Sequence, residues 1–181
     1  MSNLKLDPNN IPSHIAIIMD GNRRWAKKRL MPSFMGHEFG RRQLKPVIRE
    51  AAKLGVKFLT FWAFSTENWN RSDEEKEAIF NILRRHGKRV LSDLQKNGVR
   101  LLVIGEIERF PQDIQEILKE TIQATSNNKT ITVNLALSYG GRSEILRAVK
   151  NFTKVLWPDF NKIELKKAIV WYQQQIRNFG K

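Results

Sequence analysis

Hydrophobic and polar positions divide the chain into short apolar runs and longer stretches with helical spacing. Four runs rich in β-branched and aromatic residues predict strands, at residues 14–19, 56–64, 99–104 and 130–137. Apolar residues at i, i+3, i+4 and i+7 predict the intervening helices, at residues 44–54, 72–97 and 111–126. Strands separated by helical segments of this length pair in parallel. We therefore expect an α/β fold: a central, mainly parallel sheet flanked by helices on both faces.

Turn and capping signals mark where several of these elements begin. Asp20-Gly21-Asn22 reads as a turn, with Asn22 as the N-cap of a short helix over 23–30. Ser72 is the expected N-cap of the next long helix, with Glu75 at the capping-box position. Helices are also expected near 143–152 and 164–179. No linker rich in Gly, Ser or Pro interrupts the sequence, so we expect one domain over residues 1–181.

The charge balance narrows the classes of partner. Thirty-two Lys and Arg against 18 Asp and Glu give a net charge of +14, which favours a polyanionic partner: nucleic acid, an anionic membrane or a phosphorylated small molecule. The alternative for the densest basic cluster, residues 23–29, is a solvated helix face. The absence of cysteine excludes disulfides and thiolate chemistry and fits a reducing cytoplasm. A polar N-terminus and short apolar runs indicate neither a secretory signal nor a membrane span.

Polar side chains that could bind a ligand or take part in catalysis follow three of the four predicted strands. Ligands of open parallel sheets bind outside the carboxyl ends of the strands. The polar sets there are residues 20–25, 65–71 and 138–142. Each set contains arginine, which favours an anion-binding site at this edge. Neither of the two common glycine-rich phosphate-binding motifs occurs, so P-loop nucleotidases and dinucleotide-binding oxidoreductases lose support.

The first of these sets has a physical use in binding phosphate. Gly21 permits a close backbone approach, the following helix N-terminus favours an anion, and Asp20 offers a hard oxygen to Mg²⁺. A plain Asp-Gly turn is the alternative. His37 is either a phosphate contact or proton donor, or a structural residue. Trp25 and Trp69 are stacking platforms for bases, apolar walls of a pocket, or core residues.

Several motifs in order along the chain resemble the cis-prenyltransferases. They are HIAIIMDGNRRWAK at 14–27, Gly-His at 36–37, FSTENWNR at 64–71 and YGGR at 139–142. LWPDF at 156–160 and RNFG at 177–180 resemble the C-terminal end of that family. The main similarity covers about residues 12–150.

The resemblance implies a function and its partners. Members are homodimers with a hydrophobic tunnel, and they elongate an allylic diphosphate, usually farnesyl diphosphate, with isopentenyl diphosphate in cis geometry. The expected product is a polyprenyl diphosphate precursor of a lipid carrier. The expected location is the cytoplasm, with peripheral membrane association through the product and no nucleic-acid partner.

The resemblance also implies roles for residues of this sequence. Asp20 would hold Mg²⁺ and be the essential carboxylate, and Asn68 would assist condensation and proton loss. Trp69 would contact the prenyl chain. The expected substrate-binding residues are Gly21, Asn22, Arg23, Arg24, Trp25, His37, Ser65, Glu67, Trp69 and Arg71.

Two departures from the family pattern change the expectation. Ser33 stands where the family has an arginine that clamps diphosphate, with Arg29 and Arg41 as the candidates to replace it. Near 150–155 the chain passes almost directly to the LWPDF motif, where the family has several dozen further residues, which by the resemblance would hold isopentenyl diphosphate. A 181-residue chain would therefore bind the allylic diphosphate without elongating it. The alternatives are a non-catalytic relative or partner subunit, and a basic nucleic-acid-binding module with strongly salt-dependent affinity.

Overall fold

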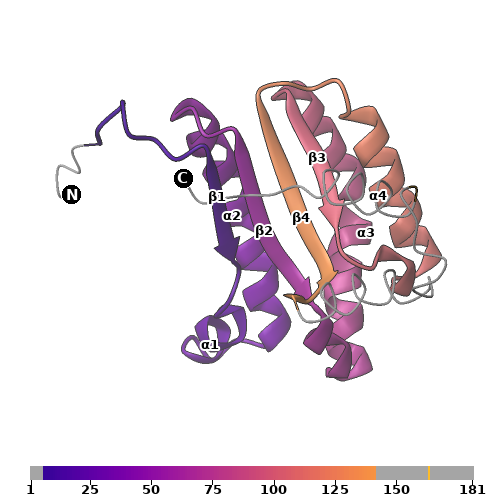
Figure 1. The fold of residues 1–181 in the computed structure, drawn as a ribbon. Coiled ribbons are helices and arrows are strands. Elements are labelled where there is room, and N and C mark those ends of the chain that lie inside the picture. The colour runs from indigo at the N-terminus through magenta and orange to yellow at the C-terminus, as the bar shows by residue number, and fades with distance from the viewer. Residues whose placement is uncertain (1–5, 142–162, 164–181) are drawn as a thin grey trace. The chain divides into compact units, whose positions relative to one another are not determined.

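The computed structural model describes residues 6–141 and residue 163, and its centre is a four-stranded sheet (Figure 1). The strands are β1 (His14–Ile18), β2 (Phe58–Ser65), β3 (Val99–Ile104) and β4 (Ile131–Tyr139). They lie in the order β1-β2-β4-β3, and all three pairings are parallel. The predicted α/β class and parallel sheet are confirmed. All four predicted strands form, within two residues at each end.

Four α-helices and two 3₁₀ turns connect the strands in the described part. They are α1 (Asn22–Lys27), α2 (Ser33–Lys53), η1 (Thr66–Asn70), α3 (Asp73–Lys96), η2 (Ile107–Arg109) and α4 (Gln112–Ala124). Helix α2 begins eleven residues before the apolar spacing that predicted it, and its first turns contact α1 through Gly36, Phe39 and Gly40. The helices expected at 143–152 and 164–179 lie outside the described residues.

The start of α1 differs from the prediction. Gly21, not Asn22, is the N-cap, and its φ of 91° is the left-handed conformation that suits glycine. Asn22 instead lies inside the helix and donates from Nδ2 to the Met19 carbonyl at 3.2 Å. The Ser72 cap of α3 is confirmed, since the Ser72 hydroxyl accepts the Glu75 N–H at 3.3 Å, while the capping-box role of the Glu75 side chain stays a prediction.

Two apolar clusters lie on one face of the sheet. The first joins α2 to the strands around the buried Leu59, Phe61 and Val133. The second joins α3 and α4 to the strand ends and is built on Phe64, Phe80, Phe110, Ile114, Leu118 and Leu137. Complete burial contributes roughly 1.5–3 kcal/mol for each large apolar side chain. The prediction that helices cover both faces of the sheet is confirmed for the face that carries these two clusters.

The chain forms two compact units, Met1–Tyr139 and Gly140–Lys181. The sheet and the helices α1 to α4 all belong to the first unit. The expectation that one domain spans residues 1–181 stays a prediction. None of the described helices is long and apolar enough to span a bilayer.

Candidate functional site

A cavity of about 1230 Å³ lies over the sheet and reaches the carboxyl ends of β1 and β2. Its walls come from all three long helices and from the strands, and include Ile48 of α2, Leu83 of α3, Leu118 of α4, and Phe61 and Leu135 of the sheet. The lining is largely apolar, and its polar side chains come from the strand ends and also from α2 and α3, which supply Arg41, Arg42, Lys45, Arg49, His86, Arg89 and Asp93. A large apolar cavity is thus present where the resemblance implies a hydrophobic tunnel.

Seven of the predicted site residues line this cavity. They are Asp20, Asn22, His37, Ser65, Glu67, Asn68 and Arg71. They follow β1 and β2, except His37, which α2 supplies. Two strands and one helix therefore bring residues from three separate sequence motifs to one end of the cavity, which we call the cavity mouth.

Asp20 is held at the mouth but remains largely exposed. Its Oδ2 accepts a charge-assisted hydrogen bond from the Arg24 guanidinium at 2.8 Å, and its Oδ1 accepts from the Gly21 N–H at 2.5 Å. The Asp20 and Arg24 side chains are 74% and 77% exposed, so solvent screens the pair and leaves it little net worth. The carboxylate can therefore exchange Arg24 for another cation at small cost.

Asn22 connects α1 to α2. A Cβ added to Gly36 would overlap the Asn22 backbone carbonyl, and one added to Gly40 would overlap the Asn22 side-chain oxygen. Only glycine permits these approaches without displacing a neighbour. The Asn22 amide also lies 3.5 Å from Nδ1 of His37, so the two polar groups share one corner of the mouth.

His37 is neutral near neutral pH. Burial lowers the pKa of its imidazole below the ordinary 6.5, and the positive charges of Arg71 and Arg23 lower it further, while Glu75 opposes them. Arg23 is itself paired with Glu75 at 3.5 Å, which ties α1 to α3 across the mouth. Two guanidinium groups thus act on one imidazole, and this electropositive corner suits an anion.

Asn68 is oriented by Ser65. The Ser65 N–H donates to Asn68 Oδ1 at 3.1 Å, and the Ser65 side chain accepts the backbone N–H of residue 68 in return. The pairing of β2 with β4 shifts register between Trp62 and Ser65, which re-aims this strand end. Since the Asn68 oxygen is occupied, its amide N–H groups are what it can offer to a ligand.

The two tryptophans of the predicted site do not line the cavity. Trp69 is half-buried in the aromatic cluster with Phe64, Phe80 and Phe110, and its Nε1 donates to Ser138 Oγ at 2.9 Å. Trp25 packs on Phe39 at 4.9 Å between ring centroids. The cavity is also not lined by Gly21, Arg23 or Arg24. The proposed contact of Trp69 with a prenyl chain stays a prediction.

A charged cluster in the cavity wall joins Arg41, one of the two candidates for the missing arginine, to a histidine that was not among the predicted site residues. Arg41 of α2 pairs with Glu38 at 2.7 Å, and His86 of α3 lies 3.6 Å from the same carboxylate. Arg41 and His86 both line the cavity. Arg41 follows His37 by one helical turn, so helical spacing could have placed them on one face. No sequence signal indicates His86, because it comes from a different helix.

The donor set at the mouth suits a metal ion that arrives with a phosphate. Mg²⁺ usually takes one or two carboxylates, with substrate phosphates and water completing its ligands. Asp20 supplies one exposed carboxylate at the mouth, which Glu67 and Arg71 also line. Within the described residues no three His, Asp or Glu side chains gather as a ready metal cage. The residues present thus fit Mg²⁺ bound together with a diphosphate.

The mouth and cavity match those expected of one enzyme family, and comparisons with known proteins agree. The Prenyltransf family model, described as "Putative undecaprenyl diphosphate synthase", matches residues 18–153. An isoprenyl transferase of Clostridium perfringens is 34% identical over 228 positions, covering 94% of this chain and 90% of that one. One of Clostridium acetobutylicum is 51% identical over 142 positions, covering 78% and 55%.

Two solved structures resemble the fold. Lavandulyl diphosphate synthase from Lavandula x intermedia, in complex with dimethylallyl diphosphate, has a TM-score of 0.77 at 30% identity and covers 87% of this chain and 70% of its own. A probable undecaprenyl diphosphate synthase from Campylobacter jejuni has a TM-score of 0.62 at 26% identity, with coverages of 95% and 100%.

The alignment with the Clostridium perfringens protein contains positions that have no counterpart in this chain. Since 94% of 181 residues is about 170, about 58 of the 228 positions aligned with the Clostridium perfringens protein have no counterpart here. The 142 positions shared with the Clostridium acetobutylicum protein equal 78% of the chain, about 141 residues, and leave no such gap. The predicted absence of several dozen residues is confirmed, and its place near 150–155 stays a prediction.

These findings together identify the family. The family model spans about three quarters of the chain, and the relative at 34% identity is aligned along most of both proteins. The chain belongs to the isoprenyl transferases, the prenyltransferase family of undecaprenyl diphosphate synthase.

Proposed function

We propose that the chain binds an allylic prenyl diphosphate, with its hydrocarbon in the cavity and its diphosphate at the cavity mouth. The observation that carries this proposal is one cavity of about 1230 Å³ with a largely apolar lining, a hydrogen-bonding mouth that holds Arg71, and cationic side chains of α2 and α3 in its wall. Pockets for drug-sized ligands measure about 300–1,000 Å³, so this one suits a longer chain than a small metabolite. A long hydrocarbon with a polyanionic head complements both parts.

Several residues of the cavity mouth would each contact the diphosphate. Arg71 and His37 line the cavity and face the head group with positive charge and a ring N–H, and Asn68 offers its amide. Arg41 is the better replacement for the arginine expected at Ser33, because it lines the cavity. Arg29 instead lies over the Trp25 ring at 4.1 Å.

The reaction that fits this arrangement is chain elongation with isopentenyl diphosphate, starting from farnesyl diphosphate and adding units in cis. The allylic carbon–oxygen bond breaks with its electron pair going to diphosphate, the allylic carbon bonds to the terminal alkene carbon of the acceptor, and a proton leaves the acceptor. Mg²⁺ held by Asp20 would stabilise the departing diphosphate. The apolar walls exclude water from the electron-poor chain end.

The chain as it stands lacks part of this machinery. About 58 positions of the Clostridium perfringens relative are missing, and the resemblance assigns to that segment the residues that hold isopentenyl diphosphate. Orienting two reactants contributes about 7–11 kcal/mol in well-aligned reactions, so its loss would silence turnover. We therefore propose that the 181-residue chain captures the starter without elongating it.

A second candidate function rests on the same missing positions. A non-catalytic relative or partner subunit would keep the starter site and obtain the acceptor site from another chain. The homodimer, the cytoplasmic location and the membrane association through product all stay predictions. Adding an isoprenyl transferase that has been inactivated by replacing the equivalent of Asp20 with Ala separates the two proposals, since only a partner subunit restores turnover in the mixture.

The test uses protein whose intact mass confirms 181 residues. It is incubated with farnesyl diphosphate, radiolabelled isopentenyl diphosphate and Mg²⁺, and long-chain product is extracted into butanol. We expect saturable binding of farnesyl diphosphate and no labelled product. Product at the rate of a family member would show the missing segment to be dispensable. Absence of farnesyl diphosphate binding would contradict the proposed site itself.

A further inference from the structure

The connection between α1 and α2 exposes apolar side chains at its tip. Residues 27–34, which we call the α1–α2 tip, are all exposed. Leu30 is 97% exposed, Phe34 53% and Met31 37%, three large apolar side chains within five residues. Single exposed apolar residues are ordinary, but a cluster on one short connection marks an interaction surface.

The conformation of Leu30 is unfavourable as well as exposed. The Met31 N–H donates to the Ala26 carbonyl at 3.0 Å and the Leu30 N–H to the Lys27 carbonyl at 3.1 Å, the pattern of a Schellman C-cap. Leu30 therefore takes the left-handed position, with φ of 55°, that glycine normally fills. A leucine that is strained in the fold and contacts almost nothing in it is suited to a contact outside it.

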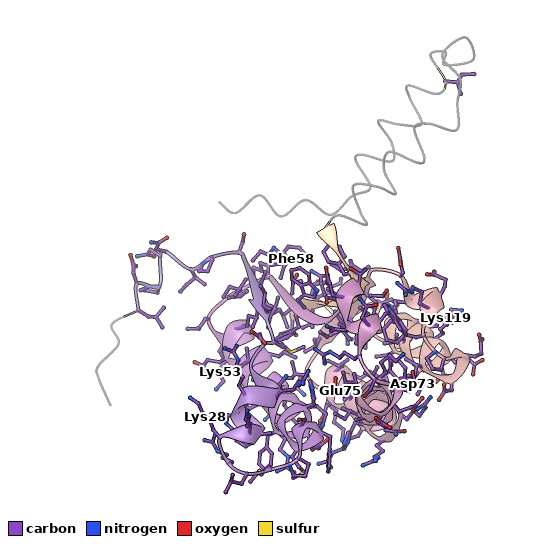
Figure 2. The ribbon with its side chains drawn as sticks, turned by 90° about the horizontal axis from the view of Figure 1, so that it is seen from below. Lys28, Lys53, Phe58, Asp73, Glu75 and Lys119 are labelled. Atoms are coloured by element: carbon purple, nitrogen blue, oxygen red, sulfur yellow. The ribbon has the colours of Figure 1, made fainter. Side chains whose placement is uncertain are left out.

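The tip also carries unneutralised positive charge. From residue 21 to residue 37 the sequence holds five cations and no carboxylate. Arg23 and Arg24 are engaged with acidic partners, and Arg29 lies over Trp25. Lys27 and Lys28 form no ion pair with any residue in the described part of the chain. Figure 2 shows Lys28 at the outer rim of the molecule.

We propose that the α1–α2 tip docks the chain on an anionic lipid membrane. Leu30, Met31 and Phe34 would enter the boundary between headgroups and acyl chains, and Lys27 and Lys28 would contact anionic headgroups. Nucleic acid would satisfy the lysines but would leave three large apolar side chains in water. The pairing of apolar tip and flanking ammonium groups therefore favours a lipid surface.

Docking in this way brings the bilayer close to the cavity mouth. Helix α1 has six residues and begins at Asn22, which lines the cavity. At 1.5 Å per residue the tip lies about 9 Å along the helix from that residue. A chain leaving the cavity would thus meet lipid near the mouth. The docking itself needs no prenyl ligand and is independent of the proposed function.

The test is flotation of the 181-residue chain with vesicles and without any prenyl diphosphate, so that binding through a product is excluded. We expect the chain to float with vesicles of phosphatidylcholine and phosphatidylglycerol and to stay behind with phosphatidylcholine alone. Replacing both Leu30 and Phe34 by Ser should weaken partition at least about tenfold. Replacing Lys27 and Lys28 by Gln should weaken it about tenfold or more, on anionic vesicles only.

Leu30→Gly is the matched control for folding. Glycine suits the left-handed position, so this variant should melt at the same or a higher temperature and yet partition several-fold more weakly. The proposal would be overturned if Leu30→Gly and the double Ser variant both kept their vesicle binding. Loss of binding in the lysine variant alone would then indicate a surface that binds polyanions in general and not a membrane-docking site. Absence of binding by the unaltered chain would overturn the proposal equally.

Discussion

The backbone carbonyl of Asn22 lies so close to Gly36 that a Cβ on residue 36 would overlap its oxygen. One turn along α2, a Cβ on Gly40 would overlap the side-chain oxygen of the same asparagine. Two glycines one turn apart therefore seat the first residue of α1, whose amide borders the cavity. The shape of the cavity mouth depends on this contact between α1 and α2.

Gly36→Ala should lower the free energy of unfolding by about 1–3 kcal/mol, as overpacking does, because backbone has to move. Alanine is otherwise preferred over glycine inside a helix by about 0.5–1 kcal/mol, so a net loss reports the contact itself. Gly40→Ala should lower the free energy of unfolding by a smaller amount, since the Asn22 side chain can rotate away from the added methyl group. Urea unfolding measures both, and a Gly36→Ala chain as stable as the original would refute the contact.

Asp20→Ala should leave stability within about 1 kcal/mol, because the Asp20–Arg24 pair is exposed to solvent. It should abolish any strengthening of farnesyl diphosphate binding by Mg²⁺. Arg24→Ala is the matched control: it breaks the same ion pair and keeps the carboxylate, so binding should weaken but still respond to Mg²⁺. Titrations with and without Mg²⁺ decide this, and an Asp20→Ala protein that keeps the metal response would argue against a metal-binding carboxylate.

His37 should make both stability and ligand affinity depend on pH. Burial and the charges of Arg71 and Arg23 lower the pKa of its imidazole below 6.5 in the folded chain. The unfolded chain therefore binds the proton more readily, and stability should fall as pH drops from 6.5 through the lower folded pKa.

Diphosphate at the mouth adds negative charge and favours the protonated imidazole. Affinity for farnesyl diphosphate should therefore rise over the interval of pH in which stability falls. His37→Gln should remove the part of this rise in affinity that comes from protonation of His37. The part that comes from titration of the diphosphate itself should be the same in the original chain and in the variant. Identical pH profiles for the two proteins would exclude His37 from the head-group site.

Trp69→Phe should affect stability more than ligand binding. The change removes the hydrogen bond to Ser138 Oγ and leaves that fully buried hydroxyl without its donor, at a cost of about 1–3 kcal/mol. Trp69 does not line the cavity, so affinity for farnesyl diphosphate should change less than threefold. A stable Trp69→Phe protein with strongly weakened affinity would instead support the contact with the prenyl chain that the family resemblance implies.

Much of the fold could be predicted because its signals are local. The period-two and period-3.6 patterns and the Ser72 cap depend on residues near one another, and the strands formed where they were expected. The first turns of α2 were not predicted, because Gly36 and Gly40 interrupt the apolar helical spacing there. Their role exists only through contact with Asn22 of another helix.

The site was predicted where one motif supplies several neighbours, as in Asp20 with Asn22 and Ser65 with Asn68. Positions that depend on tertiary packing could not be predicted in this way. Trp69 packs among Phe64, Phe80 and Phe110, which agrees with the core position that the sequence left open, and the contact with the prenyl chain that the resemblance implies stays a prediction. His86 reaches the cavity wall only because α3 packs against α2.

The most direct measurement is a calorimetric titration that compares farnesyl diphosphate with farnesol and with inorganic diphosphate. An apolar cavity with Arg71 at its mouth and further cations in its wall predicts that farnesyl diphosphate binds at least about tenfold more tightly than either fragment. Arg71→Ala should then weaken farnesyl diphosphate by about tenfold or more, as loss of a charge-assisted hydrogen bond does, and leave farnesol unchanged. Equal affinities for farnesol and farnesyl diphosphate, or an Arg71→Ala protein that binds farnesyl diphosphate as well as the original, would contradict the account.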